Sequence, residues 1–170
     1  MKRHDSVLRR LGIASHAALG LTLVAVIWSA TVSAAPVPVE QAQVAVERWL
    51  GANPEPLKEP MVKATRGGAL VASVTPLVRG RDDVFAYVVA LNPEGYVIVA
   101  PDTLLDPIVA FSGTGTFELS DENAIYILLK NDMPVRLQAA AVKATELAGQ
   151  RGGGDPDDPA VKNMALWEEL

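Results

Sequence analysis

A predicted β-hairpin is the feature that most constrains how this chain can fold. Two apolar, β-prone runs, residues 84–91 and 96–100, are separated by Asn92-Pro93-Glu94-Gly95. This tetrapeptide has proline at the second turn position and glycine at the fourth, as tight turns often do. Both faces of the 84–91 run are apolar, which is expected of an interior strand covered on both sides. The sequence therefore predicts a sheet in which this strand is interior.

The segments around the hairpin predict further strands and three helices. An apolar stripe at helical spacing predicts a first helix over residues 39–50, ended by Gly51 and the prolines that follow it. Strands are expected at residues 69–78, ending near Pro76, and at residues 108–112. A helix that begins at about Ser120, with Ile125, Leu128 and Leu129 facing the core, should end before Pro134, and another should run over residues 135–147. These patterns predict an α+β fold.

The first 34 residues have the order of a signal peptide. A basic segment within residues 1–10 precedes an apolar stretch at residues 17–28, and small residues follow it. Cleavage after Ala34 would make Ala35 the first residue of the mature chain. The alternative is an uncleaved membrane anchor over residues 11–30, although its strongly apolar part has only the length of a signal core. We expect a secreted or periplasmic protein with no stable membrane insertion after cleavage.

The charge and residue types of the mature chain exclude several function classes. The leader carries four of the 15 basic and one of the 20 acidic residues, so its removal leaves 11 and 19 and a formal net charge of −8. Nucleic acid is therefore not expected as a partner. Both histidines, His4 and His16, lie in the leader, and the chain has no cysteine. The mature chain thus lacks the side chains for a Cys-His dyad, a Ser-His-Asp triad or a zinc site of imidazole or thiolate ligands.

The C-terminal part divides into a linker and a short helix. Residues 150–159 are rich in glycine, proline and aspartate, which predicts a flexible linker, and residues 160–170 return to an apolar helix pattern around Trp167. The expected organisation is a signal peptide over residues 1–34, one domain over residues 35–149, the linker and the C-terminal helix.

The candidate ligands for ions all have simpler interpretations. Asp155, Asp157 and Asp158 offer the hard oxygens that suit calcium, but no glutamate closes such a loop, and a solvated linker explains them equally well. The Gly113-Thr114-Gly115 segment lacks the lysine of a phosphate loop and fits a tight turn. No cofactor is expected.

Candidate catalytic groups are similarly weak. Asp102 and Asp106 could form the carboxylate pair of a glycoside hydrolase, but loop aspartates beside proline more often form turns. Ser112 with Lys130 or Lys143 is a weaker catalytic candidate. The residues alone therefore favour an exported, non-catalytic binding or interaction module.

The most specific pattern of the chain lies in residues 87–117. Y-V-V-A-L-N-P-E-G-Y-V-I-V-A-P-D-T is followed, after two residues, by D-P-I-V-A-F-S-G-T-G-T-F. These segments resemble the amino-terminal propeptide of the streptopain family of cysteine peptidases and its stand-alone relative, the streptopain inhibitor. The residues that fit the family pattern are Gly95, Tyr96, Val97 to Val99, Asp102, Pro107, Ile108, Ala110, Phe111, Ser112, Gly115 and Phe117. Ala100 and Thr103 depart from it, because the family more often has serine and a second aspartate there.

This resemblance implies an antiparallel sheet flanked by amphipathic helices in a single domain. It also implies a non-catalytic chain that inhibits a streptopain-type cysteine peptidase by covering its active-site cleft. An alternative function is that of a detached or truncated propeptide acting as a non-catalytic exported interaction module.

The residues that we expect to contact such a peptidase form one loop. This candidate contact loop consists of Asp102, Thr103, Leu104, Leu105 and Asp106. It is the candidate because a turn here would project Leu104 and Leu105; alternatively, the two leucines pack over the end of the sheet.

Overall fold

The computed structural model describes residues 35–53, 55, 70–149 and 155–170. The signal peptide expected over residues 1–34, most of the proline-rich passage after the first helix and residues 150–154 of the expected linker lie outside the described residues. Among the helices that are described, none is both long enough and apolar enough to cross a membrane.

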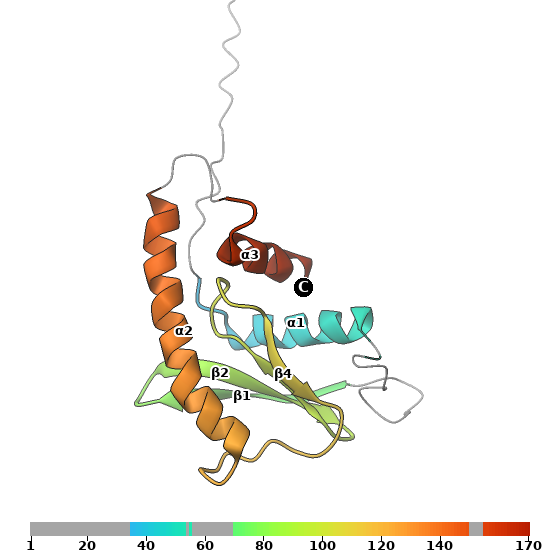
Figure 1. The fold of residues 1–170 in the computed structure, drawn as a ribbon. Helices are drawn as coiled ribbons and strands as arrows, with labels where there is room; N and C mark the ends of the chain where they lie inside the picture. The colour runs from blue at the N-terminus through green and yellow to red at the C-terminus, as the bar shows by residue number, and fades with distance from the viewer. Residues whose placement is uncertain (1–34, 54, 56–69, 150–154) are drawn as a thin grey trace, which may run out of the picture. The chain divides into compact units, whose positions relative to one another are not determined.

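The described elements form a single α+β domain, as predicted (Figure 1). In chain order they are α1 (Val39–Ala52), β1 (Leu70–Arg79), β2 (Asp83–Asn92), β3 (Tyr96–Val99), β4 (Ile108–Ser112), α2 (Ala124–Ala148) and α3 (Pro159–Glu169). The four strands form one antiparallel sheet in the order β1-β2-β3-β4.

The predicted hairpin is confirmed. β2 and β3 pair as antiparallel neighbours, with Val89 opposite Val97, and β2 lies between β1 and β3. Gly95 closes the turn at a φ of +99°, where a side chain is strained. A Cβ atom at this position would also lie 2.7 Å from the Ser112 carbonyl oxygen, so β4 approaches the turn too closely for any residue larger than glycine.

The interior position of β2 explains its apolar composition. Its side chains on both faces are buried, among them Phe85, Tyr87, Val88 and Val89. α1 contacts β1, β2 and β3, whereas α2 contacts β2. No polar or charged residue is buried in the described part of the chain, so the core is held together by apolar packing.

β1 continues through Pro76 to Arg79, so the expectation that it ends near that proline is wrong. Proline has no N–H to donate to a neighbouring strand, so in a central strand it would remove one hydrogen bond of the sheet. β1 is an edge strand that pairs only with β2, and an edge strand tolerates proline where the missing donor would face away from its neighbour.

α2 also differs from the prediction, because one helix replaces the two that were expected on either side of Pro134. Its N-cap is Asn123, whose side chain accepts a hydrogen bond from the Ile125 N–H at 3.0 Å. Figure 1 shows α2 as one continuous ribbon that changes direction partway along, as is common where proline removes a hydrogen bond inside a helix. Of the three residues expected to face the core at its start, Leu129 does so, whereas Ile125 and Leu128 are exposed.

Candidate functional site

The candidate contact loop connects β3 to β4, and its two aspartates organise its backbone. Asp102 accepts a hydrogen bond from the Leu104 N–H at 2.8 Å, and Asp106 accepts one from the Ile108 N–H at 3.1 Å. Burial raises the pKa of Asp102 above its ordinary value, and the hydrogen bond from Leu104 acts in the opposite direction. Both carboxylates therefore act as turn formers here, which is the simpler of their two interpretations.

An N-terminal strap, defined as Ala35, Pro36 and Val37, pairs with one side of this loop. The Thr103 N–H donates to the Ala35 carbonyl at 3.2 Å, and the Val37 N–H donates to the Pro101 carbonyl at 2.9 Å. The backbone N–H of Ala35 also donates to the Thr103 hydroxyl at 3.3 Å. Val37 is buried, and its carbonyl accepts a hydrogen bond of 2.6 Å from the Tyr87 hydroxyl. The strap thereby ties the loop to the centre of the sheet.

Two side chains of α3 donate hydrogen bonds to the backbone of the contact loop. The Asn163 amide donates to the Leu104 carbonyl and the Trp167 indole N–H donates to the Leu105 carbonyl, both at 2.9 Å. These bonds satisfy two backbone acceptors that a tight loop cannot pair within itself. α3 is thus packed on the domain, although the segment before it was expected to be a flexible linker.

The two leucines of the loop have different environments. Leu104 is only 3% exposed and packs in a small apolar cluster with Ala140 and Leu147 of α2 and Ala160 of α3. Leu105 is half-buried between this cluster and the main core. Leu104 is therefore packed inside the domain, against α2 and α3 rather than over the end of the sheet, and contact of the loop with a peptidase stays a prediction.

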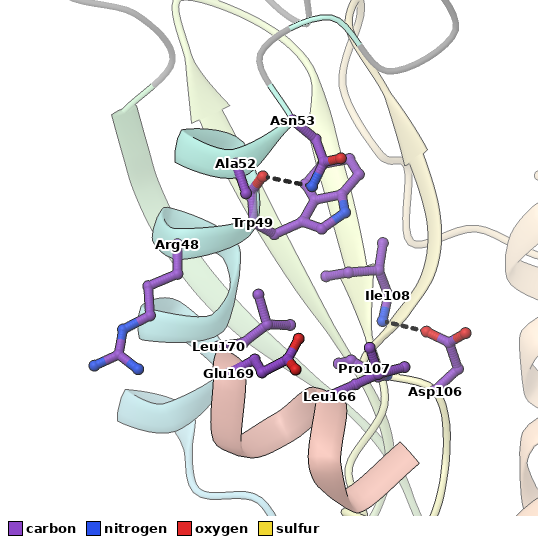
Figure 2. A pocket seen from close by; sticks show the side chains of 10 residues that line it. All are labelled: Arg48, Trp49, Ala52, Asn53, Asp106, Pro107, Ile108, Leu166, Glu169 and Leu170. Carbon is purple, nitrogen blue, oxygen red and sulfur yellow. Dashed lines mark hydrogen bonds between the residues drawn. The ribbon is translucent and has the colours of Figure 1, made fainter. Parts of the chain in front are cut away.

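Two cavities adjoin the loop. The first, of about 380 Å³, lies where the end of α1, the start of β4 and the end of α3 meet (Figure 2). Its lining residues are Arg48, Trp49, Ala52, Asn53, Asp106, Pro107, Ile108, Leu166, Glu169 and Leu170. Figure 2 shows the Trp49 and Ile108 side chains facing it from α1 and β4 and Asp106 directed to the Ile108 backbone. The volume is sufficient for one large side chain.

The second cavity, of about 470 Å³, lies between the loop, α2 and α3 and is lined by Leu104, Ala140, Lys143 and Asp158 among others. The Lys143 ammonium and the Asp158 carboxylate form an ion pair of 2.6 Å across it. The hydrogen bond to Asp158 raises the pKa of Lys143, and the same bond lowers the pKa of Asp158. Asp158 also caps α3 by accepting from the Ala160 N–H at 2.9 Å.

The other residues that the sequence singled out have structural partners. Asp155 accepts from the Asp157 N–H, and Asp157 pairs with Lys162. Of the two lysines considered beside Ser112, Lys130 pairs with Asp121. Within the described residues, no group of three histidine, cysteine, aspartate or glutamate side chains could hold a metal ion.

The turn at residues 113–115 is joined to the hairpin. Gly95 donates its N–H to the Gly115 carbonyl at 2.8 Å, and the Gly115 N–H donates to the Glu94 carboxylate at 3.0 Å. The Ser112 hydroxyl donates to the Thr114 carbonyl at 2.8 Å. These groups form hydrogen bonds within the domain, as expected of a turn with a structural role.

The sequence interpretation missed an exposed apolar stripe on α2. Leu128, Val135 and Val142, which we name the outer stripe, are 63%, 64% and 58% exposed. They are seven residues apart, so they share one face of the helix. This spacing is visible in the sequence, but the break expected at Pro134 separated Leu128 from the other two residues.

Comparison with known proteins adds one match. The family model described as Spi protease inhibitor matches residues 34–133. The matched region contains the strap, all four strands, the contact loop and the start of α2. No curated protein and no solved structure matches the chain significantly.

Proposed function

We propose, because the chain belongs to the Spi protease inhibitor family, that it inhibits a streptopain-type cysteine peptidase by covering its active-site cleft. The family match over residues 34–133 is the observation that carries the proposal. A protease-inhibitor domain has a protease as its partner, and the pattern of residues 87–117 supports a peptidase of the streptopain type.

Inhibition by contact rather than by reaction agrees with the residues of the chain. Beyond residue 34 the sequence contains neither histidine nor cysteine, and no charged or polar side chain is buried in the described part of the chain. Such a domain can act on a partner through the shape of its surface. We therefore propose reversible steric occlusion, with the contact loop as one part of the interface.

Export is part of the same proposal. We propose that cleavage after Ala34 releases a secreted or periplasmic domain that begins with the strap. The backbone of Ala35 takes part in the pairing with Thr103. Cleavage at this position would therefore leave the strap complete.

The test is a peptidase titration with the chain from Ala35 onward, which contains every described residue. We expect stoichiometric, reversible loss of activity of a streptopain-type peptidase, with intact inhibitor recovered afterwards. A papain-type peptidase is the matched control for general inhibition of cysteine peptidases and should stay active. Full activity of the streptopain-type enzyme at micromolar inhibitor would overturn the proposal, and binding without inhibition would instead support a non-catalytic interaction module.

A further inference from the structure

α3 covers two carbonyl groups of the contact loop. Asn163 and Trp167 donate one hydrogen bond each, to the Leu104 and Leu105 carbonyls, at 2.9 Å. Trp167 is only 5% exposed and packs in the main core. We name the two carbonyls, together with the apolar surface on which Trp167 packs, the covered site. A peptidase that contacts this part of the loop would find both acceptors already paired.

α3 is docked less closely than the other two helices. α1 contacts three strands and α2 contacts β2, whereas α3 makes no comparably close contact with any other described helix or strand. Two of its side chains, those of Ala160 and Trp167, are buried. Segments with few buried apolar contacts are the ones that open locally while the rest of a domain stays folded.

A cavity lies beside each end of α3. The cavity of about 470 Å³ is lined by Ala160 and Asn163 near the start of the helix. The cavity of about 380 Å³ is lined by Leu166 and Leu170 near its end (Figure 2). Side chains that line a void lack part of the dispersion contacts that a close-packed interior provides. Opening of α3 therefore sacrifices less packing than opening of α1 or α2 would.

The family match separates α3 from the loop that it covers. Residues 34–133 contain the strap and the contact loop, whereas α3 begins at Pro159. The matched part, on which the proposed inhibition rests, therefore does not include the helix that pairs with its loop. α3 can leave the loop without removing any residue of the matched part.

We propose that the covered site is a contact site for the peptidase and that α3 occupies it until the peptidase displaces the helix. This inference rests on the proposed function, which supplies a protease as the partner. The segment of the peptidase that replaces α3 presents the same chemistry as α3, namely two hydrogen-bond donors and one apolar side chain about as large as tryptophan. α3 lowers the apparent affinity of the chain, because the peptidase binds only the fraction of molecules in which the site is open.

The first test weakens the docking of α3 in the chain from Ala35 onward. The release variant carries Asn163→Ala and Trp167→Phe, which remove both donors, and alanine favours the helix more than asparagine does. The control variant carries Lys162→Ala and Glu168→Ala at exposed positions of α3 and keeps the same net charge. We expect the release variant to bind the peptidase about tenfold more tightly, whereas the control should change by less than about twofold. A helix that only stabilises the loop would give weaker binding instead.

A second measurement needs no substitution in α3. Beyond residue 34 the chain has two tryptophans, Trp49 and Trp167, so fluorotryptophan gives two fluorine NMR signals, which Trp49→Phe assigns. When unlabelled peptidase is added, the Trp167 signal should shift between light and heavy water as the signal of an exposed ring does. The Trp49 ring packs against Phe111 at a centroid distance of 5.0 Å. Its signal should stay away from the value in urea, which shows that the domain remains folded.

The outcomes separate the two proposals. Unchanged or weaker binding by a folded release variant overturns α3 as a competitor and leaves the inhibitor function standing, and so does a wild-type complex in which Trp167 stays shielded. If the release variant does not fold, the fluorine measurement on the wild type decides alone. Binding by the release variant but not by the wild type supports the displacement of α3. If neither chain binds a peptidase, both proposals fail.

Discussion

Shortening Leu104 to alanine tests whether the contact loop is mainly part of the core or mainly a binding surface. Leu104 is 3% exposed, and its carbonyl bond to Asn163 does not depend on its side chain. Buried leucine-to-alanine substitutions cost about 2–5 kcal/mol of unfolding free energy. We expect a cost at the low end of this range for two reasons. The neighbours Ala140 and Ala160 are small, and the site adjoins the open 470 Å³ cavity. We therefore expect a loss of about 2–3 kcal/mol.

The assay combines urea unfolding with peptidase titration. A loss of this size should lower the melting temperature by roughly 6–12 °C and leave a folded domain. The folded Leu104→Ala variant should still inhibit, because the leucine side chain faces α2 and α3. Leu70→Ala is the matched control at an exposed leucine and should change the unfolding free energy by less than about 0.5 kcal/mol. An unchanged stability of Leu104→Ala together with lost inhibition would refute this reasoning and make Leu104 a contact residue.

Three further substitutions test the sheet, the turn and the ion pair. Val89→Asp places a carboxylate at a position with 0% exposure, and no charged side chain is buried in the described part of the chain. It should cost several kcal/mol and bring the domain close to unfolding, measured by circular dichroism melts; a normal melt would contradict the interior strand. Gly95→Ala introduces a Cβ atom 2.7 Å from the Ser112 carbonyl at a positive φ and should cost more than about 1 kcal/mol in urea unfolding. Asp158→Asn keeps the cap of α3 but removes the charge beside Lys143. Because the pKa of Asp158 is lowered in the folded state, the stability contributed by its charge is present above the unfolded value of 3.8 and is lost as pH falls through the lower folded pKa. The melting temperatures of the wild type and Asp158→Asn should therefore differ at pH 7 and converge below the folded pKa of Asp158; a constant difference would contradict the role of the ion pair.

The sequence was sufficient for elements whose signals are local. The hairpin follows from a turn tetrapeptide between two apolar runs, and the interior position of β2 follows from its two apolar faces. The breaks expected at two prolines were predicted less well, because the effect of a proline on a strand or helix depends on tertiary surroundings that the sequence does not show. Pro76 is tolerated because β1 turns out to be an edge strand, and Pro134 is accommodated within a helix that continues past it.

The site was predicted only in part, because its geometry depends on residues far apart in the chain. Asn163 and Trp167 lie 59 and 62 residues from the carbonyls that they cap. No local pattern pairs them with the loop, so the sequence could not decide between a projecting and a packed Leu104 side chain. The outer stripe was missed for a different reason: the break expected at Pro134 divided a seven-residue spacing between two short helices.

The pairing of the strap has a consequence for the order in which the domain assembles. Ala35 and Thr103 are 68 residues apart, and Tyr87 reaches back over 50 residues to Val37. During synthesis the strap emerges before its partners exist, and closing so long a loop becomes favourable only when the partner surface has formed. We therefore expect the hairpin to form first and the strap to dock late. Nascent chains that end before residue 101 should leave Val37 open to proteolysis, and protection should begin once the loop between β3 and β4 has been made.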